Sequence, residues 1–154
     1  FMCCGISDEE WTLATVSTKL SGLGLRSTEK HSPAAFLASR SACHSLCTKL
    51  DPDHVWEISD RDSAAAHALS DYNSNVAEDD RLPTQLDDPP RQRQLSHALD
   101  ARTRARFQET SDTSRRAHME LTSVENAGQW LHTTPSSATQ SNVDPLLFKT
   151  YIQR

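Results

Sequence analysis

The sequence predicts an all-α fold of about six helices in two small groups. Apolar residues recur at three- and four-residue spacing in several stretches, Ser or Asp precedes most of these stretches, and proline-containing segments separate them. Hydrophobic residues make up 36% of the 154 residues. This is below the roughly 45–50% of ordinary globular chains, so we expect a small core. With no run of about 18 apolar residues, we expect no membrane span and an intracellular chain.

The first helix is predicted to begin at a capping box. Ser7 stands at the N-cap position, and Glu10 follows at the spacing that lets its carboxylate return to the Ser7 backbone N–H. The apolar pattern then predicts a helix that runs to about Leu20. Gly22 is placed to end it as a left-handed C-cap.

An extended strip is predicted to follow this helix. It consists of Gly22, Leu23, Gly24, Leu25 and Arg26. Alternation puts the two leucines on one side, where we expect them to anchor the strip to the helices, and the glycines allow close backbone approach. A third glycine and a strand–helix context are missing, so the strip is not a dinucleotide-binding fingerprint.

Two more helices are predicted before residue 77. The second begins with Ser32 as N-cap and Pro33 at the first helical position, and ends at Asp51. Its predicted buried stripe is Phe36, Cys43, Cys47 and Leu50. The third is capped at 59–60, after a turn in which Trp56 is expected to point inward. Its predicted buried side is Ala65, Ala68, Leu69, Tyr72 and Val76.

An acidic, proline-containing linker, 77–90, is predicted to join an N-terminal group, 1–76, to a C-terminal group, 91–154. The C-terminal group is predicted to hold three helices. The first carries Leu95, Leu99 and Phe107; the second is capped by Ser111 or Asp112 and buries Ala117, Leu121 and Val124; the last starts at Asp144-Pro145 with Leu147, Phe148, Tyr151 and Ile152.

No catalytic centre, cofactor site or small-molecule substrate site is predicted. The histidines are scattered without metalloprotease spacing, and the paired acids at 79–80 and 87–88 are interpreted as solvated loop residues. Cys43, His44 and Cys47 are candidate zinc ligands, with Cys3 or Cys4 to complete the site, and Cys43 with His44 could instead serve a small hydrolase. A closed zinc site needs four converging ligands, so buried free cysteines are the preferred interpretation and no metal is expected.

Charge is distributed unevenly along the chain. Residues 51–88 hold eleven acids against two arginines, whereas residues 91–116 hold seven arginines against three acids. Arginine guanidinium groups bind phosphate in a forked geometry. The candidate nucleic-acid-binding residues are Arg102, Arg104, Arg106, Arg115 and Arg116. The alternative is a solvated helix face on which these arginines pair with Asp100, Glu109 and Glu120.

The segment Gly22–Ser27 followed by His31–Ser39 resembles reverse transcriptases of non-LTR retrotransposons, in the region downstream of the polymerase catalytic domain. Weaker matches follow in the same order. They are Gln92–Ser96 with Leu99-Asp100, Ala127 with Trp130-Leu131 and Pro135-Ser136, and Asp144-Pro145 with Phe148. The resemblance covers nearly the whole chain from Trp11. Ser21 departs from it, because the family often has a glycine there.

This resemblance implies a non-catalytic fragment of a longer chain, from the thumb side of the polymerase or just after it. The family's catalytic aromatic-x-Asp-Asp motif belongs upstream and is missing here. The implied partner is RNA or an RNA–DNA hybrid, held through backbone phosphates. The alternative is a helical protein-interaction or structural module that binds no nucleic acid.

Overall fold

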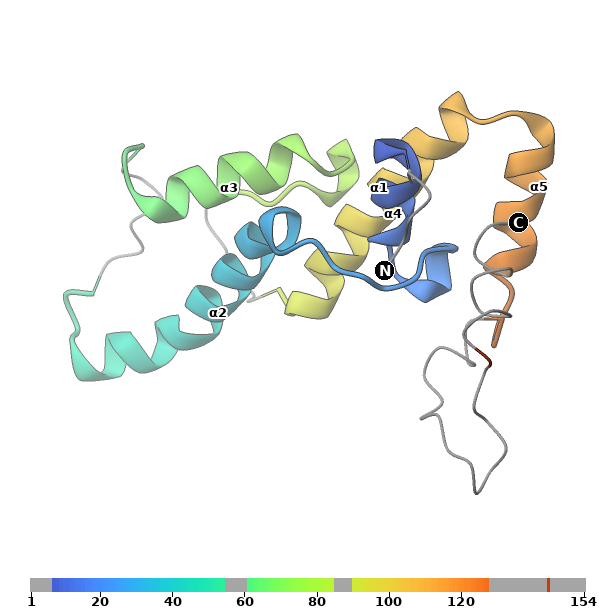
Figure 1. Ribbon diagram of the computed structural model, residues 1–154. Coiled ribbons are helices and arrows are strands. Elements are labelled where there is room, and N and C mark those ends of the chain that lie inside the picture. The colour runs from blue at the N-terminus through green and yellow to red at the C-terminus, as the bar shows by residue number, and fades with distance from the viewer. Residues whose placement is uncertain (1–6, 55–60, 85–89, 128–143, 145–154) are drawn as a thin grey trace, which may run out of the picture.

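The computed structural model describes residues 7–54, 61–84, 90–127 and 144 (Figure 1). Its elements are α1 (Asp8–Ala14), η1 (Thr18–Leu20), α2 (Thr28–Leu50), α3 (Ala64–Ser74), η3 (Glu78–Asp80), α4 (Gln92–Thr110) and α5 (Thr113–Thr122). These residues contain helices and no strand, which confirms the all-α prediction. None of the described helices is long and apolar enough to cross a membrane. The predictions for Trp56 and for the last helix fall outside the described residues. The cap predicted at 59–60 was wrong, because α3 begins at Ala64 with Ser63 as its N-cap.

The core lies where α2 packs against both α3 and α4. Its buried residues are Ala34, Leu37, Ala38, Ala65, Leu69, Tyr72, Val76, Leu95, Ala98 and Leu99. Helices from both sides of the predicted linker contribute to this one cluster. The groups 1–76 and 91–154 therefore do not correspond to two separate cores within the described parts of the chain. At the other end of α4, α1 packs against it, and α5 packs against η1.

The start of α1 follows the prediction, but its end does not. The Ser7 hydroxyl accepts the Glu10 N–H at 3.3 Å, and the Glu10 carboxylate accepts the Ser7 N–H at 3.0 Å, which completes the capping box. The helix stops at Ala14 rather than near Leu20. The left-handed residue that caps the end of η1 is Ser21, with φ 71°, and not Gly22.

The strip 22–26 is held to the end of α1 by its backbone. The N–H groups of Leu23 and Leu25 both donate to the Ala14 carbonyl, at 3.1 and 3.2 Å, and the Gly24 N–H donates to the Val16 carbonyl at 2.8 Å. These bonds satisfy carbonyls that the end of a helix leaves without intrahelical partners. Leu23 is half-buried, but Leu25 is 46% exposed. Backbone hydrogen bonds, rather than a leucine pair, anchor the strip.

Helix α2 differs from its prediction in start and in orientation. It begins at Thr28, with Ser27 as N-cap, so Pro33 lies inside the helix. It buries Ala34, Leu37, Ala38 and Ser41. The predicted stripe of Phe36, Cys43, Cys47 and Leu50 faces the other way, with Leu50 89% exposed and Cys43 exposed, so the stripe and the buried Cys43 were wrong. Small side chains let α2 approach its neighbours closely, and that packing outweighs the larger apolar residues on its opposite side.

Helix α3 buries the predicted side, with Ala65, Leu69, Tyr72 and Val76 in the core. Ser63 is its N-cap. The first part of the linker returns to the core: the Asn73 side chain donates to the Leu82 carbonyl at 2.9 Å and accepts the Leu82 N–H at 2.8 Å. Leu82 packs against the core cluster.

Tyr72 should make the fold sensitive to alkali. Its side chain is 1% exposed, and burial, together with the nearby Asp80 carboxylate, raises the pKa of Tyr72 to about 12. The unfolded phenol loses its proton near pH 10, while the folded one keeps it. The free energy of unfolding should therefore fall as pH rises from 10 to 12, as measured by urea titration. Tyr72→Phe should remove this pH dependence of the free energy of unfolding. An unchanged slope against pH in that variant would show that Tyr72 is not its source.

Of the last two described helices, α4 buries its predicted residues and α5 does not. In α4, Leu95, Leu99 and Phe107 are buried as expected, and Asp112 caps α5 by accepting the Arg115 N–H at 2.7 Å. Helix α5 buries only Met119. The predicted α5 face was wrong: Ala117 is exposed, and Leu121 and Val124 are 71% and 61% exposed. The Ser21 hydroxyl donates to the Met119 carbonyl, so this other side of α5 meets the turn after η1.

Candidate nucleic-acid interface

One face of α4 changes from leucine to arginine along its length. Leu95, Leu99, Arg102 and Arg106 follow one another at helical spacing on the same side. The two leucines are buried in the core, whereas Arg102 is half-buried and Arg106 is exposed. No acid of the described chain lies within ion-pair distance of either guanidinium. Beyond the core, this face of α4 therefore presents two arginines that have no carboxylate partner in the described chain.

Arg104 lies on the opposite side of α4 and binds α5. Its guanidinium contacts the Glu120 carboxylate at 3.0 Å and donates to the Ser123 hydroxyl at 3.3 Å. Gln108 donates to the same Glu120 oxygen at 2.9 Å. A half-buried arginine with these partners joins two helices, so its first role is structural.

Arg115 joins α5 to α1. Its guanidinium contacts the Glu10 carboxylate at 3.2 Å and stacks over the Phe107 ring at 5.2 Å from the centroid. The pKa of Glu10 is lowered mainly by the N–H and hydroxyl of Ser7, with a smaller contribution from Arg115. Arg116 is exposed on α5, and no acid of the described chain lies within ion-pair distance of it. The five predicted arginines are thus divided among different surfaces.

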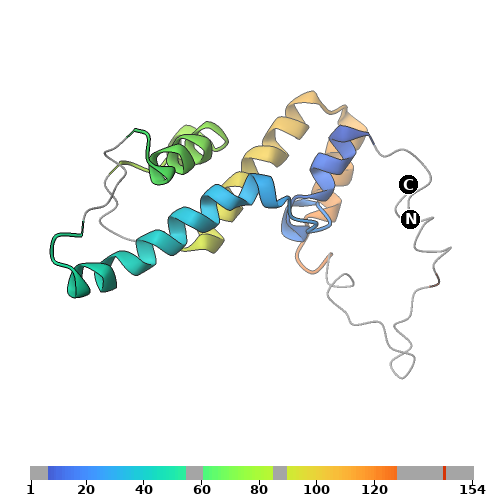
Figure 2. The same ribbon diagram turned by 60° about the vertical axis from the view of Figure 1, so that its left-hand side comes forward.

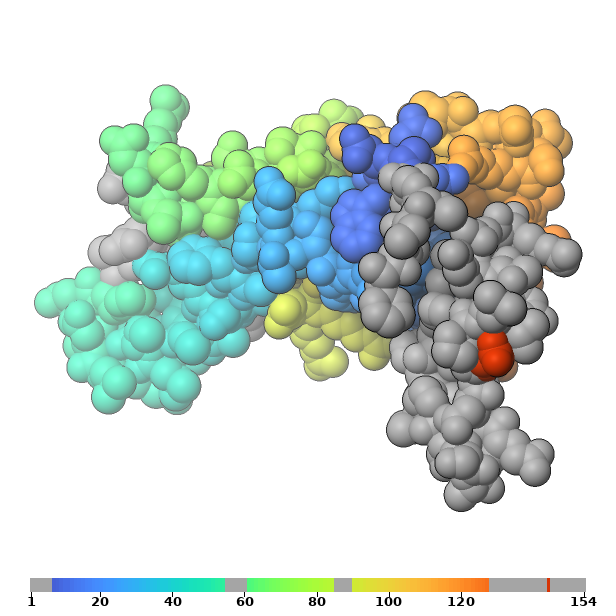
Figure 3. Space-filling view, in the orientation of Figure 1, coloured from blue at the N-terminus to red at the C-terminus, as the bar shows by residue number. Residues whose placement is uncertain are grey.

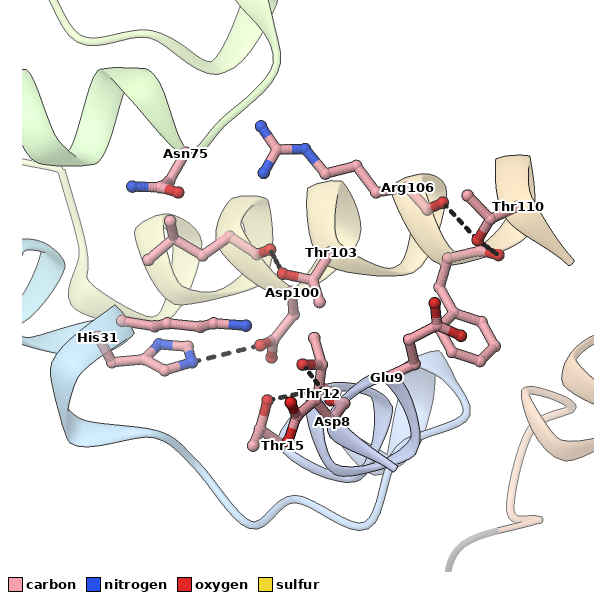
Figure 4. Close-up of a pocket in the computed structure, with 13 residues that line it drawn as sticks. Asp8, Glu9, Thr12, Thr15, His31, Asn75, Asp100, Thr103, Arg106 and Thr110 are labelled. Atoms are coloured by element: carbon pink, nitrogen blue, oxygen red, sulfur yellow. Dashed lines mark hydrogen bonds and ion pairs between the residues drawn. The ribbon is translucent and has the colours of Figure 1, made fainter. Parts of the chain in front are cut away.

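A groove of about 320 Å³ lies beside the arginine face, between α1, the start of α2 and α4 (Figure 4). Arg106 and Lys30 supply its cations, and Thr12 and Thr103 are among its hydroxyls. Asp8, in the first turn of α1, makes the opposite wall acidic, and Figure 4 shows Arg106 reaching away from it toward Asn75. The sequence pattern does not predict this groove, because its lining comes from elements far apart in the chain.

Asp100 forms the polar floor of the groove. Its carboxylate is 4% exposed and accepts the Ser17 N–H at 3.3 Å. The same carboxylate lies 3.3 Å from His31 Nε2 and 3.7 Å from the Arg26 guanidinium. His31 is 12% exposed, and its other ring nitrogen, Nδ1, is buried without a hydrogen-bond partner.

Asp100 was expected to pair with the α4 arginines, but it instead joins α4 to η1, the strip and α2. One sequence signal could have identified it. Asp100 directly follows Ala98 and Leu99 at the edge of the buried face, and a carboxylate there needs partners from neighbouring elements.

Cys43 and Cys47 lie apart from this groove, on the outer face of α2. Cys43 is exposed and Cys47 is half-buried, and the His44 and His54 rings are tilted by 43° with centroids 5.5 Å apart. Within the described ranges, no three His, Cys, Asp or Glu side chains converge as a metal site would require.

No protein-family model matches this sequence, and neither does any curated protein or solved structure. The resemblance to retroelement reverse transcriptases therefore rests on the motifs themselves. In the structure, its strongest part, Gly22–Ser27 with the following helix, forms the strip and α2, and each of them contacts the Asp100 carboxylate.

Proposed function

We propose that this chain is a non-catalytic part of a reverse-transcriptase-like retroelement protein that contacts RNA or an RNA–DNA hybrid through backbone phosphates. The observation that carries the proposal is the arginine face of α4. Arg102 and Arg106 have no carboxylate partner in the described chain, and Lys30 lies across the same groove as Arg106.

The geometry of this face suits a nucleic-acid backbone. Arg102 and Arg106 are one helical turn apart, which separates their Cα atoms by about 6 Å along the helix axis. Two guanidinium groups at that spacing can contact successive phosphates of one strand. A-form duplexes are held largely through backbone and shape, without base readout. Sequence-independent binding with strong salt dependence follows from such contacts.

The other predicted arginines have different roles in this proposal. Arg104 and Arg115 are paired with Glu120 and Glu10, so they hold α5 in place rather than contact phosphate. Arg116 remains a candidate contact on the exposed side of α5.

Reversing the charge of the arginine face should abolish most of the binding. Arg102→Glu with Arg106→Glu should weaken binding to a fluorescently labelled RNA–DNA hybrid by at least about tenfold at low salt. The slope of log affinity against log salt should fall by roughly two phosphate contacts. The measurement is fluorescence anisotropy over a salt series, with circular dichroism to establish that the variant keeps its helix content.

The matched control reverses two cations elsewhere. Lys49→Glu with Arg61→Glu makes the same change in net charge at the end of α2 and just before α3, away from α1 (Figure 1). Neither residue lines the groove. This control should bind nearly as well as the unchanged chain. Equal losses in both variants would show attraction by net charge alone. No binding at low salt would leave the interaction-module alternative, which the exposed apolar face of α2 favours.

A further inference from the structure

Helix α1 carries an exposed tryptophan at the edge of the groove. Trp11 is 49% exposed, and its carbonyl accepts the Thr15 N–H at 3.1 Å. It stands three residues after Asp8 and four before Thr15, and both of these residues line the groove. Residues at these spacings lie on the same side of a helix. The indole of Trp11 therefore borders the groove rather than the opposite side of α1.

The position of α1 keeps this side chain at the surface. Helix α1 packs beside α4, as Figure 2 shows, and none of its residues is buried. In the space-filling view, atoms of α1 form part of the face turned toward the viewer (Figure 3). A ligand in the groove can contact Trp11 without displacing any core residue.

An exposed indole is a suitable surface for an unpaired nucleic-acid base. Every base has a flat π-face, and proteins that bind single strands stack bases on aromatic side chains. Bases within a duplex are already stacked on one another, whereas bases in loops and bulges can turn outward onto an aromatic ring. Trp11 is therefore matched to a base that has left its strand's own stack.

The charges of the groove give a bound nucleotide one orientation. Arg106 and Lys30 belong to α4 and α2, whereas Asp8 and Glu9 belong to α1 (Figure 4). A phosphate is attracted by the cations and repelled by the carboxylates, so it lies on the side of α4 and α2. The base of the same nucleotide is then directed toward α1, where Trp11 stands.

The size of the groove limits what it holds. Its volume of about 320 Å³ is near the lower end of the range for small-ligand pockets, roughly 300–1,000 Å³. We propose that the groove and Trp11 form a binding site for one unpaired nucleotide, with its phosphate at Arg106 and Lys30 and its base stacked on Trp11. This inference rests on the proposed function, because Arg106 serves both, and it adds a contact to a base.

A hybrid with a single bulged nucleotide tests this site. One labelled RNA–DNA hybrid carries an unpaired adenosine in its RNA strand, and its control carries an abasic residue there, with the same number of phosphates. The whole chain should bind the adenosine hybrid at least about fivefold more tightly in fluorescence anisotropy. The preference should disappear in Trp11→Ala and largely return in Trp11→Phe, which keeps a flat ring. Circular dichroism establishes that both variants keep their helix content.

Leu46 supplies the matched control variant. Its side chain is 59% exposed on α2 and does not line the groove, so Leu46→Ala should keep the preference for the adenosine hybrid. Equal affinities of the unchanged chain for the two hybrids would overturn the proposal, and so would a preference that survives Trp11→Ala.

A fully paired hybrid separates this site from the proposed function. The chain should bind it about as tightly as the abasic hybrid, because both offer phosphates and no free base. If the chain binds both of these hybrids and the bulged adenosine adds nothing, the Trp11 site is refuted while phosphate contact stands. If the chain binds none of the three hybrids at low salt, phosphate contact is refuted as well.

Discussion

Replacing Gly22 by alanine is expected to destabilise the fold by more than about 3 kcal/mol. A Cβ at this position would lie 2.0 Å from the Val16 carbonyl oxygen and 2.7 Å from the Leu13 carbonyl oxygen. Both are backbone atoms at the end of α1, so no side chain can move aside. The strip would have to leave the Ala14 and Val16 carbonyls, and the three backbone hydrogen bonds that hold it would be lost. Urea unfolding followed by circular dichroism measures the effect.

Gly24 supplies the matched control for this substitution. A Cβ there meets only Thr18 Cγ2 at 3.7 Å, but the residue has φ +72°. Gly24→Ala should therefore lower the free energy of unfolding by only about 1–2 kcal/mol, because alanine adopts a left-handed backbone conformation less favourably than glycine. If the two alanine variants were equally stable, the close approach at Gly22 would not exist as described, and the account of the strip would be wrong.

The two glycines show what local sequence can and cannot predict. The alternating Gly/Leu pattern indicated an extended strip with close backbone contact, and Gly22 makes that contact. The same pattern could not tell which residue would be left-handed, because that depends on where α1 stops. Ser21 takes the role because the chain turns through η1 first.

Helix starts were predicted where the cap is a local contact, at α1 and α5, but not at α2, which begins at Thr28 rather than after Ser32. The capping box of α1 and the Asp112 cap of α5 are local side-chain contacts, and both were identified from residue spacing. The buried side of α2 depends instead on what packs against it. Periodicity selected the larger apolar residues, such as Leu50, but α3 and α4 pack on the side of Ala34 and Ala38.

The sequence predicted only part of the candidate site, because the rest depends on contacts between distant elements. Composition alone indicated an arginine-rich segment on α4 and α5. Which guanidinium groups are already paired depends on acids that are far away in the sequence or on another helix. Arg115 on α5 contacts Glu10 on α1, near the other end of the described chain, and Arg104 on α4 contacts Glu120 on α5. The groove beside Arg106 required three elements to meet, so no local pattern contains it.

Replacing Asp100 by alanine is expected to lower the free energy of unfolding by about 3 kcal/mol, since it leaves part-buried donors without an acceptor. The Ser17 N–H and His31 Nε2 would lose their partner, and Arg26 would lose its nearest carboxylate. Asp100→Asn keeps one carbonyl oxygen in place and should cost less. Glu109→Ala, at an exposed position on the same helix, is the control and should change stability by less than about 0.5 kcal/mol.

Hydrogen exchange locates the effect of the Asp100 substitution. Because Asp100 joins α4 to the turn before η1 and to the start of α2, amides at both places should exchange faster in Asp100→Ala. Amides of α3 touch none of these contacts and should change only as global stability changes. Uniform faster exchange across all helices, α3 included, would mean that Asp100 supports the core generally. Selective exchange at Ser17 and His31 would establish it as the residue that holds the strip and the groove together.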